Sequence, residues 1–287
     1  MSEGTSRRRL RTGCLLLVLI GALVCGCATL TYAVFPPPPL DILVLGLDAR
    51  PGESDVARAD GLILVGVNPA GLQLSLLSIP RDLRLDLPGY GVQAINTAFP
   101  LGELEVPGTG SDLTAEGLEQ VLPAAIDRTV RLRFEDFTAL IDAAGGVTVN
   151  VERTIRDDAY PLSDTEVMSI QFDPGTQWMN GERALQYIRT RHADDDYARA
   201  DRQQDVMQAL ARQIRNPLTW PSVIEALGQI ETDLTLAELI GLAPVVLLNA
   251  GQFEQRTIDR SLLVPAGEGQ WAVDWETLRP WVEAHFD

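Results

Sequence analysis

Three long apolar runs near the start of the chain constrain its fold more than any other feature. Residues 41–47 (DILVLGL), 61–67 (GLILVGV) and 72–78 (LQLSLLS) each have the length of a strand and are almost continuously apolar. Strands of this kind are typically buried on both faces, whereas a half-solvated strand alternates apolar and polar residues. Residues 68–71 (NPAG) have turn composition and predict a hairpin between the second and third runs. The sequence therefore predicts a sheet that is covered on both sides.

Helical patterns follow these strands. Periodicity is helical from Leu113 to about Leu140, and 147–151 (VTVNV) alternates like a strand. Residues 152–180 are expected to be irregular. Further helices are expected at 182–188, 199–214, 221–230, 235–249 and 274–285, with a late strand at 256–264. Because strands and helices are interleaved, we predict a layered α/β domain.

The first 40 residues have the composition of a membrane anchor. Arg7, Arg8, Arg9 and Arg11 precede an uncharged stretch, and its apolar part is long enough to cross a ~30 Å hydrocarbon core as a helix. Arginines on that side predict an N-terminus inside the cell and the bulk of the chain outside. We expect a cytoplasmic tail at 1–12, a transmembrane signal-anchor helix at 13–35, a proline-rich linker at 36–40 and an extracytoplasmic domain at 41–287. The protein would then lie in the cell membrane as a single-pass chain.

Two other fates of this segment stay open. Residues 24–27 (VCGC) faintly resemble a lipoprotein cleavage box that would make Cys27 the lipidated residue, and a conventional signal peptide would be cleaved. The apolar run continues beyond Cys27, which favours the uncleaved anchor. All three cysteines lie in this segment, so the outer domain has no disulfide and depends on its core for stability.

The charged residues exclude several classes of function. All 23 basic residues are arginine, so catalysis by a Schiff-base lysine or phosphate binding by a P-loop lysine is excluded. The formal net charge of −17 does not favour nucleic acid as a partner, because phosphate backbones require a basic field. The sequence also contains no glycine-rich phosphate loop and no G-x-S-x-G element.

Arginine and aspartate concentrate where the apolar strands end. One pair follows the first run, one precedes the second and one follows the third: Asp48 and Arg50, Arg58 and Asp60, Arg81 and Asp82. The ends of strands are where α/β folds place their sites. The alternative interpretation is structural, since aspartate often caps turns and surface ion pairs of arginine contribute little.

A second basic group lies between residues 187 and 204. Arg189 and Arg191 are two apart and would share a face of an extended chain, while Arg199, Arg202 and Gln203 share one side of a helix near its N-terminus. Guanidinium groups bind phosphate oxygens in bidentate fashion, and carboxylates suit Mg²⁺, which commonly bridges phosphates. If both groups face one cleft, the pattern predicts a pyrophosphate site with a divalent metal.

The chain resembles the LytR–CpsA–Psr family of bacterial membrane-anchored phosphotransferases in several of its sequence blocks. The resemblance covers the chain from Asp41 onward, and several independent blocks occur in the family's order. They are ILVLGLDAR (42–50), RADGLILVGVNP (58–69), LSIPRD (77–82), INTAF (95–99), FTALIDAAGGVTVNV (137–151), MNGERALQYIRTRH (179–192) and ARADRQQDVMQAL (198–210). Ala59 and Gly61 depart from the family's usual residues.

The resemblance implies a central mixed β-sheet sandwiched between α-helices, with a pocket for a polyprenyl pyrophosphate. Residues 137–144 and 223–230 are candidates to line that pocket, although lining and packing need the same residue types. Carried over by motif, Asp48 and Asp60 would be the metal ligands, for Mg²⁺ or alternatively Mn²⁺. The pyrophosphate would be bound by Arg58, Arg81, Arg189, Arg191, Arg199 and Gln203. Arg58 and Arg81 would be catalytic, and Asp82 is a candidate general base or a structural partner of Arg81.

The function that the resemblance implies is transfer of a glycopolymer phosphate from a polyprenyl-pyrophosphate carrier in the bilayer to a peptidoglycan hydroxyl, and we expect Mg²⁺ to assist it. Two alternatives use the same residues. With water as acceptor, the protein would be a polyprenyl-pyrophosphate hydrolase. Without catalysis, it would be a membrane protein that binds lipid pyrophosphate.

Overall fold

The computed structural model describes residues 23, 26–27, 29–48, 56–161, 166–190, 196–249, 253–267 and 270–286. The chain divides into two compact units, Met1–Pro38 and Pro39–Asp287. In the first unit, residues 29–34 are helical. Within the described part of the chain, no helix has both the length and the apolar character needed to cross a membrane. Part of the span predicted at 13–35 lies outside the described residues.

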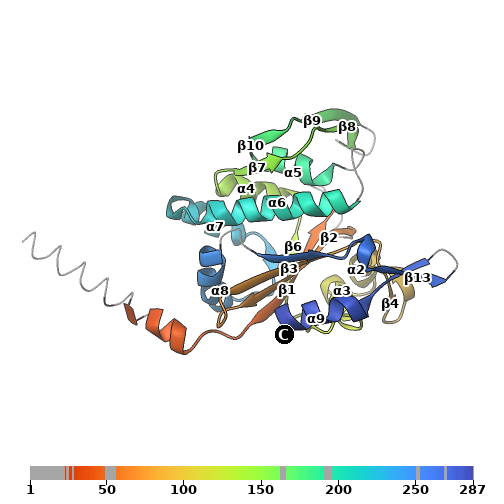
Figure 1. Cartoon of the computed structure of the whole chain (residues 1–287), viewed down its shortest axis with the longest axis horizontal. Helices are drawn as coiled ribbons and strands as arrows, with labels where there is room; N and C mark the ends of the chain where they lie inside the picture. The colour runs from red at the N-terminus through yellow and green to blue at the C-terminus, as the bar shows by residue number, and fades with distance from the viewer. Residues whose placement is uncertain are drawn as a thin grey trace, which may run out of the picture. The chain divides into compact units, whose positions relative to one another are not determined.

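The second unit is built on a six-stranded sheet in the order β11–β6–β1–β2–β3–β12 (Figure 1). These strands are β1 (Leu40–Leu47), β2 (Ala59–Asn68), β3 (Gln73–Ile79), β6 (Arg128–Leu132), β11 (Glu231–Thr232) and β12 (Glu254–Thr257). Strand β2 is antiparallel to β1 and β3, while β6 runs parallel to β1 and β12 runs parallel to β3. The predicted apolar strands and their hairpin are confirmed, and the sheet is mixed. The C-terminal ends of β1, β3, β6 and β12 and the start of β2 therefore share one end of the sheet, called here the upper end.

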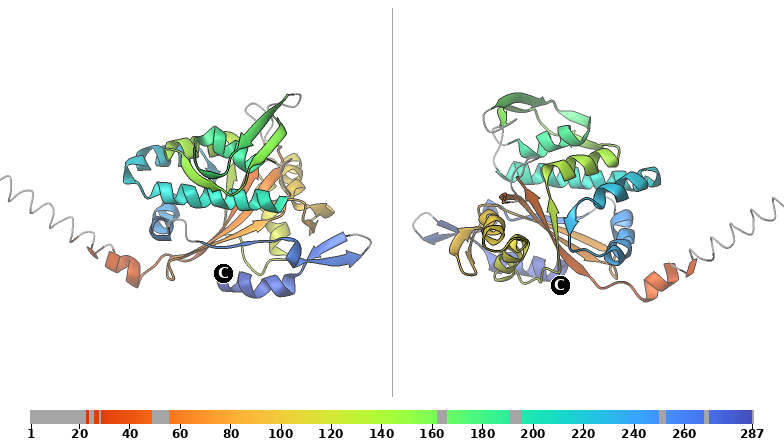
Figure 2. Two further views of the ribbon diagram at one scale, coloured as in Figure 1. Left: turned by 45° about the horizontal axis from the view of Figure 1, so that its top comes forward. Right: turned by 180° about the vertical axis from the view of Figure 1, so that it is seen from behind.

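Helices cover both faces of this sheet, as predicted (Figures 1 and 2). On one face, α2 (Ala98–Glu105), α3 (Gly110–Glu119) and α9 (Trp275–His285) pack on the largest core cluster. That cluster contains fully buried residues of the central strands, including Leu43, Leu45, Leu64 and Leu77. On the other face lie α4 (Phe134–Ala143), α6 (Asp196–Ile214), α7 (Trp220–Leu227) and α8 (Leu236–Asn249), with α5 (Gly181–Arg189) packed on α4 and α6.

The packing between the sheet and this second layer is less complete. Leu242 and Val245 of α8 bury one end of β1, and residues of α4 and α7 pack near β6. Between these two clusters, however, Val44, Val65 and Val130 are only half-buried, although they lie on interior strands of the sheet. Apolar side chains at the middle of a covered sheet are normally buried completely. The central strands thus keep some accessible apolar surface on this face.

Smaller hairpins extend from the two layers. They are β4 (Arg84–Leu87) with β5 (Gly91–Ala94), β7 (Val147–Val151) with β10 (Gly175–Met179), β8 (Ile155–Pro161) with β9 (Val167–Phe172), and β13 (Leu263–Gly267) with β14 (Gln270–Val273). The described residues also include three short 3₁₀ turns: η1 (Ile95–Thr97), η2 (Pro217–Thr219) and η3 (Arg260–Leu262).

Three predictions about local structure were wrong. The segment 152–180 contains the strands β8, β9 and β10 instead of irregular chain, and 128–132 is a strand inside the predicted helical stretch. The late strand at 256–264 is divided between β12 and β13. In β8 the charged pair Arg156 and Asp158 masks an alternating pattern of buried and exposed positions, because Asp157 between them is buried. The predicted helices at 182–188, 199–214, 221–230, 235–249 and 274–285 are confirmed within a few residues.

Candidate functional site

A β-bulge places Asp60 at the upper end of the sheet. Gly46 pairs with Gly61 and Leu47 pairs with Ala59, so the register between β1 and β2 passes over Asp60. A bulge of this kind bends one strand and re-aims a side chain, and bulges are frequent beside active sites. Just beyond it, the amide of Asp48 donates a hydrogen bond to the carbonyl of Arg58 at 2.9 Å. The two predicted metal ligands therefore come from adjacent strands at the same end of the sheet.

Asp60 lies at the centre of a polar network that joins three separate segments. Arg81 Nη1 contacts Asp60 Oδ2 at 2.9 Å, and both side chains are mostly shielded from solvent. Asn96 Nδ2 lies 3.5 Å from Asp60 Oδ1, and the Asn96 amide donates to the Arg81 carbonyl at 3.0 Å. From α6, Arg199 Nη2 donates to the Asp60 backbone carbonyl at 3.1 Å. Two predicted phosphate-binding arginines, 118 residues apart in sequence, thus meet at one aspartate.

Arg189 is held beside the other aspartate by aromatic side chains. It is the last residue of α5, and its guanidinium lies 4.0 Å from the centre of the Phe134 ring. Its Nη2 is 3.4 Å from Asp48 Oδ1, and its Nη1 donates to the Tyr160 hydroxyl at 3.4 Å. Burial raises the pKa of Tyr160, so the hydroxyl stays protonated. A planar guanidinium stacked on a ring keeps its donors aligned, which suits it to a phosphate.

The N-terminal half of α6 presents its residues to different neighbours. A Cβ atom at Gly61 would lie 4.0 Å from Gln203 Nε2, so Gln203 faces the sheet beside the Asp60 bulge. Arg202 is buried elsewhere, with Nε donating to the Tyr187 carbonyl at 3.0 Å and Nη2 to the Thr190 carbonyl at 2.6 Å. Arg202 therefore ties α6 to α5, and the sequence interpretation that grouped it with Arg199 and Gln203 on one binding face was wrong.

The remaining predicted residues are placed less fully. Arg58 is exposed and lies next to Ala59, the first residue of β2. Asp82 is exposed in the turn after β3, and Arg81 pairs with Asp60 instead of with Asp82. The alternative in which Asp82 is the structural partner of Arg81 is therefore not what the structure has. Arg50 and Arg191 lie outside the described residues.

Carboxylates at the upper end of the sheet are the candidate ligands for a divalent metal. Among the described residues, no group of three or more His, Cys, Asp or Glu side chains gathers in a way that could hold a metal ion. Asp48 and Asp60 provide carboxylate oxygens at one end of the sheet, each next to an arginine. Mg²⁺ is usually bound by one or two carboxylates together with substrate phosphates and water. The pair fits a metal site that is completed by a phosphate ligand.

Sequence reasoning missed three residues of this site. Asn96 belongs to the quoted block at 95–99, but nothing in its pattern indicated contact with Asp60 and Arg81. Phe134 and Tyr160 support Arg189, and Tyr160 lies in the segment that was predicted to be irregular. A single aromatic residue in a polar stretch carries no signal of its own, since its partner is fixed only by the tertiary fold.

Known proteins with this sequence pattern and this fold provide an independent comparison. Residues 36–279 match the LytR_cpsA_psr family. The chain belongs to that family. The resemblance inferred from the quoted blocks is therefore confirmed over most of the sequence, and the arginines and aspartates described above lie inside the matched region.

The relatives of this family member include teichoic acid transferases. The chain is 35% identical over 206 residues to the polyisoprenyl-teichoic acid–peptidoglycan teichoic acid transferase TagU of Oceanobacillus iheyensis, covering 70% of this chain and 60% of that protein. It is 32% identical over 220 residues to the corresponding transferase TagT of Bacillus subtilis, covering 71% and 63%. The matched part is thus less than two thirds of these relatives' length. The crystal structure of Bacillus subtilis TagV has the same fold, with a TM-score of 0.68, 28% identity, and coverage of 87% and 98%.

Proposed function

We propose that this protein transfers a glycopolymer phosphate from a polyprenyl-pyrophosphate carrier to a hydroxyl of peptidoglycan. The observation that carries the proposal is the convergence of Arg81, Arg189 and Arg199 on the paired aspartates at the upper end of the sheet. Three guanidinium groups from distant segments match the charge and geometry of a diphosphate. The names of the TagU and TagT relatives support the same donor and acceptor classes.

The apolar part of the carrier requires its own binding surface. The half-buried Val130, Val44 and Val65 lie on the neighbouring strands β6, β1 and β2, between the two ends of the sheet, and Leu210 and Ile214 of α6 pack on the cluster that contains Val130. Segments 137–144 and 223–230, which were predicted to line a lipid pocket, contribute to the same cluster. We propose that the polyprenyl chain lies on this surface, between the sheet and the second helix layer, with its diphosphate at the arginines.

The reaction is a substitution at the phosphorus that bears the glycan. An acceptor hydroxyl oxygen forms a bond to this phosphorus, and the bond to the bridging oxygen breaks, so that polyprenyl phosphate leaves with that oxygen. Asp82 is exposed next to Arg81 and would accept the proton of the attacking hydroxyl. Arg58, Arg81, Arg189, Arg191, Arg199 and Gln203 would hold the diphosphate and neutralise the charge on the leaving phosphate. Bound by Asp48 and Asp60, Mg²⁺ or Mn²⁺ would add further charge neutralisation.

We further propose that residues 13–35 anchor the protein in the cell membrane with residues 41–287 outside, because the carrier resides in the bilayer. The uncharged stretch after Arg7–Arg11 supports this placement. The proline-rich residues 36–40 would then act as a short, stiff spacer.

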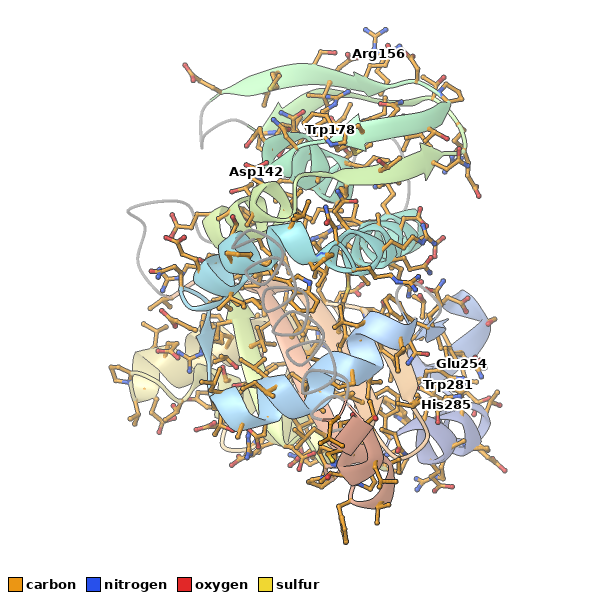
Figure 3. The ribbon with its side chains drawn as sticks, turned by 90° about the vertical axis from the view of Figure 1, so that its left-hand side faces the viewer. Asp142, Arg156, Trp178, Glu254, Trp281 and His285 are labelled. Atoms are coloured by element: carbon orange, nitrogen blue, oxygen red, sulfur yellow. The ribbon has the colours of Figure 1, made fainter. Side chains whose placement is uncertain are left out.

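The test is transfer of a labelled glycopolymer from its polyprenyl-pyrophosphate carrier to purified peptidoglycan by the full chain in proteoliposomes. Arg81→Ala and Asp60→Ala are each expected to lower the transfer rate by about 10²-fold or more while the domain stays folded. The matched control is Arg156→Ala, which also removes an arginine paired with an aspartate, at 2.9 Å, but on the exposed hairpin β8–β9 (Figure 3). That variant should transfer at the wild-type rate.

Three outcomes would contradict the proposal in different ways. Transfer at the wild-type rate by Arg81→Ala would show that the upper end of the sheet is not the active site. Release of soluble glycan phosphate in the presence of peptidoglycan, without label on the peptidoglycan, would identify a hydrolase. Binding of the carrier without any product would identify a non-catalytic lipid-pyrophosphate receptor.

A further inference from the structure

Helix α8 is apolar nearly all the way round, although one side of it faces solvent. Glu238 is its only charged residue, and Arg128 on the sheet pairs with it at 2.6 Å. Leu242 and Val245 pack on the sheet, but Leu236, Ile240 and Leu248 are 71%, 66% and 65% exposed. Leu236 and Ile240 are one turn apart and Leu248 lies about two turns further on, so the three side chains form a stripe within roughly a third of the helix circumference. An exposed apolar stripe on a helix indicates a partner or a membrane surface.

Further apolar side chains are exposed on elements at the same end of the domain as α8. Leu218 of η2 and Trp220, Ile224 and Leu227 of α7 are also exposed. In the described part of the domain, half of the large apolar side chains that are exposed belong to residues 218–248. Helices α7 and α8 lie at the same end of the domain in all views, and α8 crosses the front of the sheet in Figure 3. We call this surface the α7–α8 face.

The position of the first residue of β1 indicates what covers the α7–α8 face. Leu40, the first residue of β1, packs in one cluster with Leu242 and Val245 of α8. Asn249 at the end of α8 donates to the Leu72 carbonyl at 2.6 Å, in the turn between β2 and β3. The first strand of the domain therefore begins at the α8 end of the sheet, and the apolar segment 13–35 precedes it in the sequence. The six residues 35–40 (FPPPPL) reach roughly 19 Å at most, at about 3.1 Å per residue in a polyproline conformation.

We propose that the α7–α8 face inserts its exposed leucine, isoleucine and tryptophan side chains into the outer interface of the lipid bilayer. The inference rests on the proposed function and on the proposed membrane anchor. It adds the orientation of the domain relative to the bilayer. The upper end of the sheet, with its arginines, then points away from the bilayer. The half-buried Val44, Val65 and Val130 lie between the two ends, so a polyprenyl chain can run from the bilayer along the sheet to the site. The eight residues of β1 span about 26 Å, a distance that a long polyprenyl chain can bridge.

The binding test uses the full chain with Cys14, Cys25 and Cys27 replaced by serine, in nanodiscs that hold one protein each. A single cysteine at Ile240 or at Leu248 carries an environment-sensitive fluorophore, and the quencher is a doxyl-labelled lipid. The matched control is Val167→Cys, since Val167 is 62% exposed and lies on the hairpin β8–β9, distant from α8 (Figure 1). Quenching at Ile240 and Leu248 is expected to be at least about threefold stronger than at Val167.

Equal quenching at the three positions would overturn the proposal, whatever the activity of the protein. Shielding of the Ile240 probe that appears only at high protein density in liposomes would assign the face to a second copy of the chain, which also overturns it. This measurement does not involve glycan transfer, so its failure is distinguishable from failure of the proposed function.

A second measurement connects the face to the carrier. The variant Leu236→Asn/Ile240→Asn/Leu248→Asn is expected to transfer glycopolymer from a bilayer-resident carrier about tenfold more slowly than wild type. With a short-chain carrier in detergent, both proteins should transfer at rates within about twofold of each other, because no bilayer has to be approached. An equal loss in both assays would assign the stripe to structure instead of membrane docking.

Discussion

Replacement of Arg189 by lysine distinguishes two roles of its guanidinium: packing on the Phe134 ring, which contributes to stability, and the proposed binding of phosphate, which contributes to activity. The chain contains a matched control on the same helix. Arg183 lies 3.7 Å from the centre of the Phe172 ring, as Arg189 lies 4.0 Å from Phe134, and both arginines are half-buried. Arg183 also donates to Gln186 at 3.0 Å, whereas Arg189 contacts Asp48. The two substitutions therefore remove similar packing, but only one of them affects the predicted phosphate site.

The expected magnitudes follow from these contacts. Loss of the stacked guanidinium costs about 0.5–1 kcal/mol in either variant, which lowers the melting temperature by about 1–4 °C for a domain of this size. A lysine at position 189 keeps the charge but loses the two-pronged contact with a phosphate, worth about 1.5–3 kcal/mol for bonds to charged groups. At about 1.4 kcal/mol per tenfold change, kcat/KM for transfer should fall about 10–100-fold in Arg189→Lys.

The assay combines thermal unfolding with glycopolymer transfer in proteoliposomes. Arg183→Lys should show the same loss of stability with transfer at the wild-type rate. If Arg189→Lys transfers within about twofold of wild type, or if Arg183→Lys loses as much activity, the arginine at the end of α5 does not act on phosphate and the reasoning fails.

Three further predictions concern the strand, the pH dependence and the aromatic support. Gly66→Ala should lose about 1–3 kcal/mol of stability in urea unfolding, because the added Cβ would lie 2.6 Å from a backbone carbonyl oxygen of α9. In the control variant Gly61→Ala, the added Cβ would lie 3.5 Å from its nearest neighbour, so the loss should be less than about 1 kcal/mol. A hydrogen bond from Arg128 of β6 lowers the pKa of Glu238 from 4.5 to about 2. The stability advantage of wild type over Glu238→Gln should therefore be complete above pH 4.5 and should be lost as the pH falls through about 2. Melting temperature measured against pH checks this. Tyr160→Phe keeps the ring but removes the hydroxyl that accepts from Arg189 at 3.4 Å, and transfer should fall about two- to fivefold; an unchanged rate would show that the hydroxyl does not position the guanidinium.

The parts of the fold that could be predicted are those with a strong local signal. The apolar runs at β1, β2 and β3 identified buried strands, and the Thr235–Glu238 pattern identified the start of α8, where the Glu238 amide donates to Thr235 Oγ1 at 3.2 Å. Strand β6 was missed because its five residues, RTVRL, form neither an apolar run nor a regular alternation, and all of them are half-buried. Its identity as a strand comes from its parallel pairing with β1, which is a long-range contact.

The candidate site was predictable as a set of residues but not as a geometry. Aspartates and arginines at strand ends indicated Asp48, Asp60 and Arg81, and helical spacing indicated Arg199. The bulge that re-aims Asp60 depends on the register between two strands, which no local pattern specifies. The same holds for Arg202, since a residue three positions from Arg199 can face either the sheet or α5, and the packing of the two helices decides.

The long separations within this site affect how the protein must fold. Arg189 reaches Asp48 across 141 residues of sequence, and Arg199 reaches the Asp60 carbonyl across 139. Loops of this length close slowly compared with hairpins, so β1, β2 and β3 can pair well before the arginines arrive. During synthesis from the N-terminus, a chain that stops before α6 holds the aspartates and a paired sheet but lacks Arg199 and Gln203. If the proposed function is correct, the nascent protein would complete its diphosphate site only after two thirds of it has been made, and a half-finished chain would not sequester the carrier.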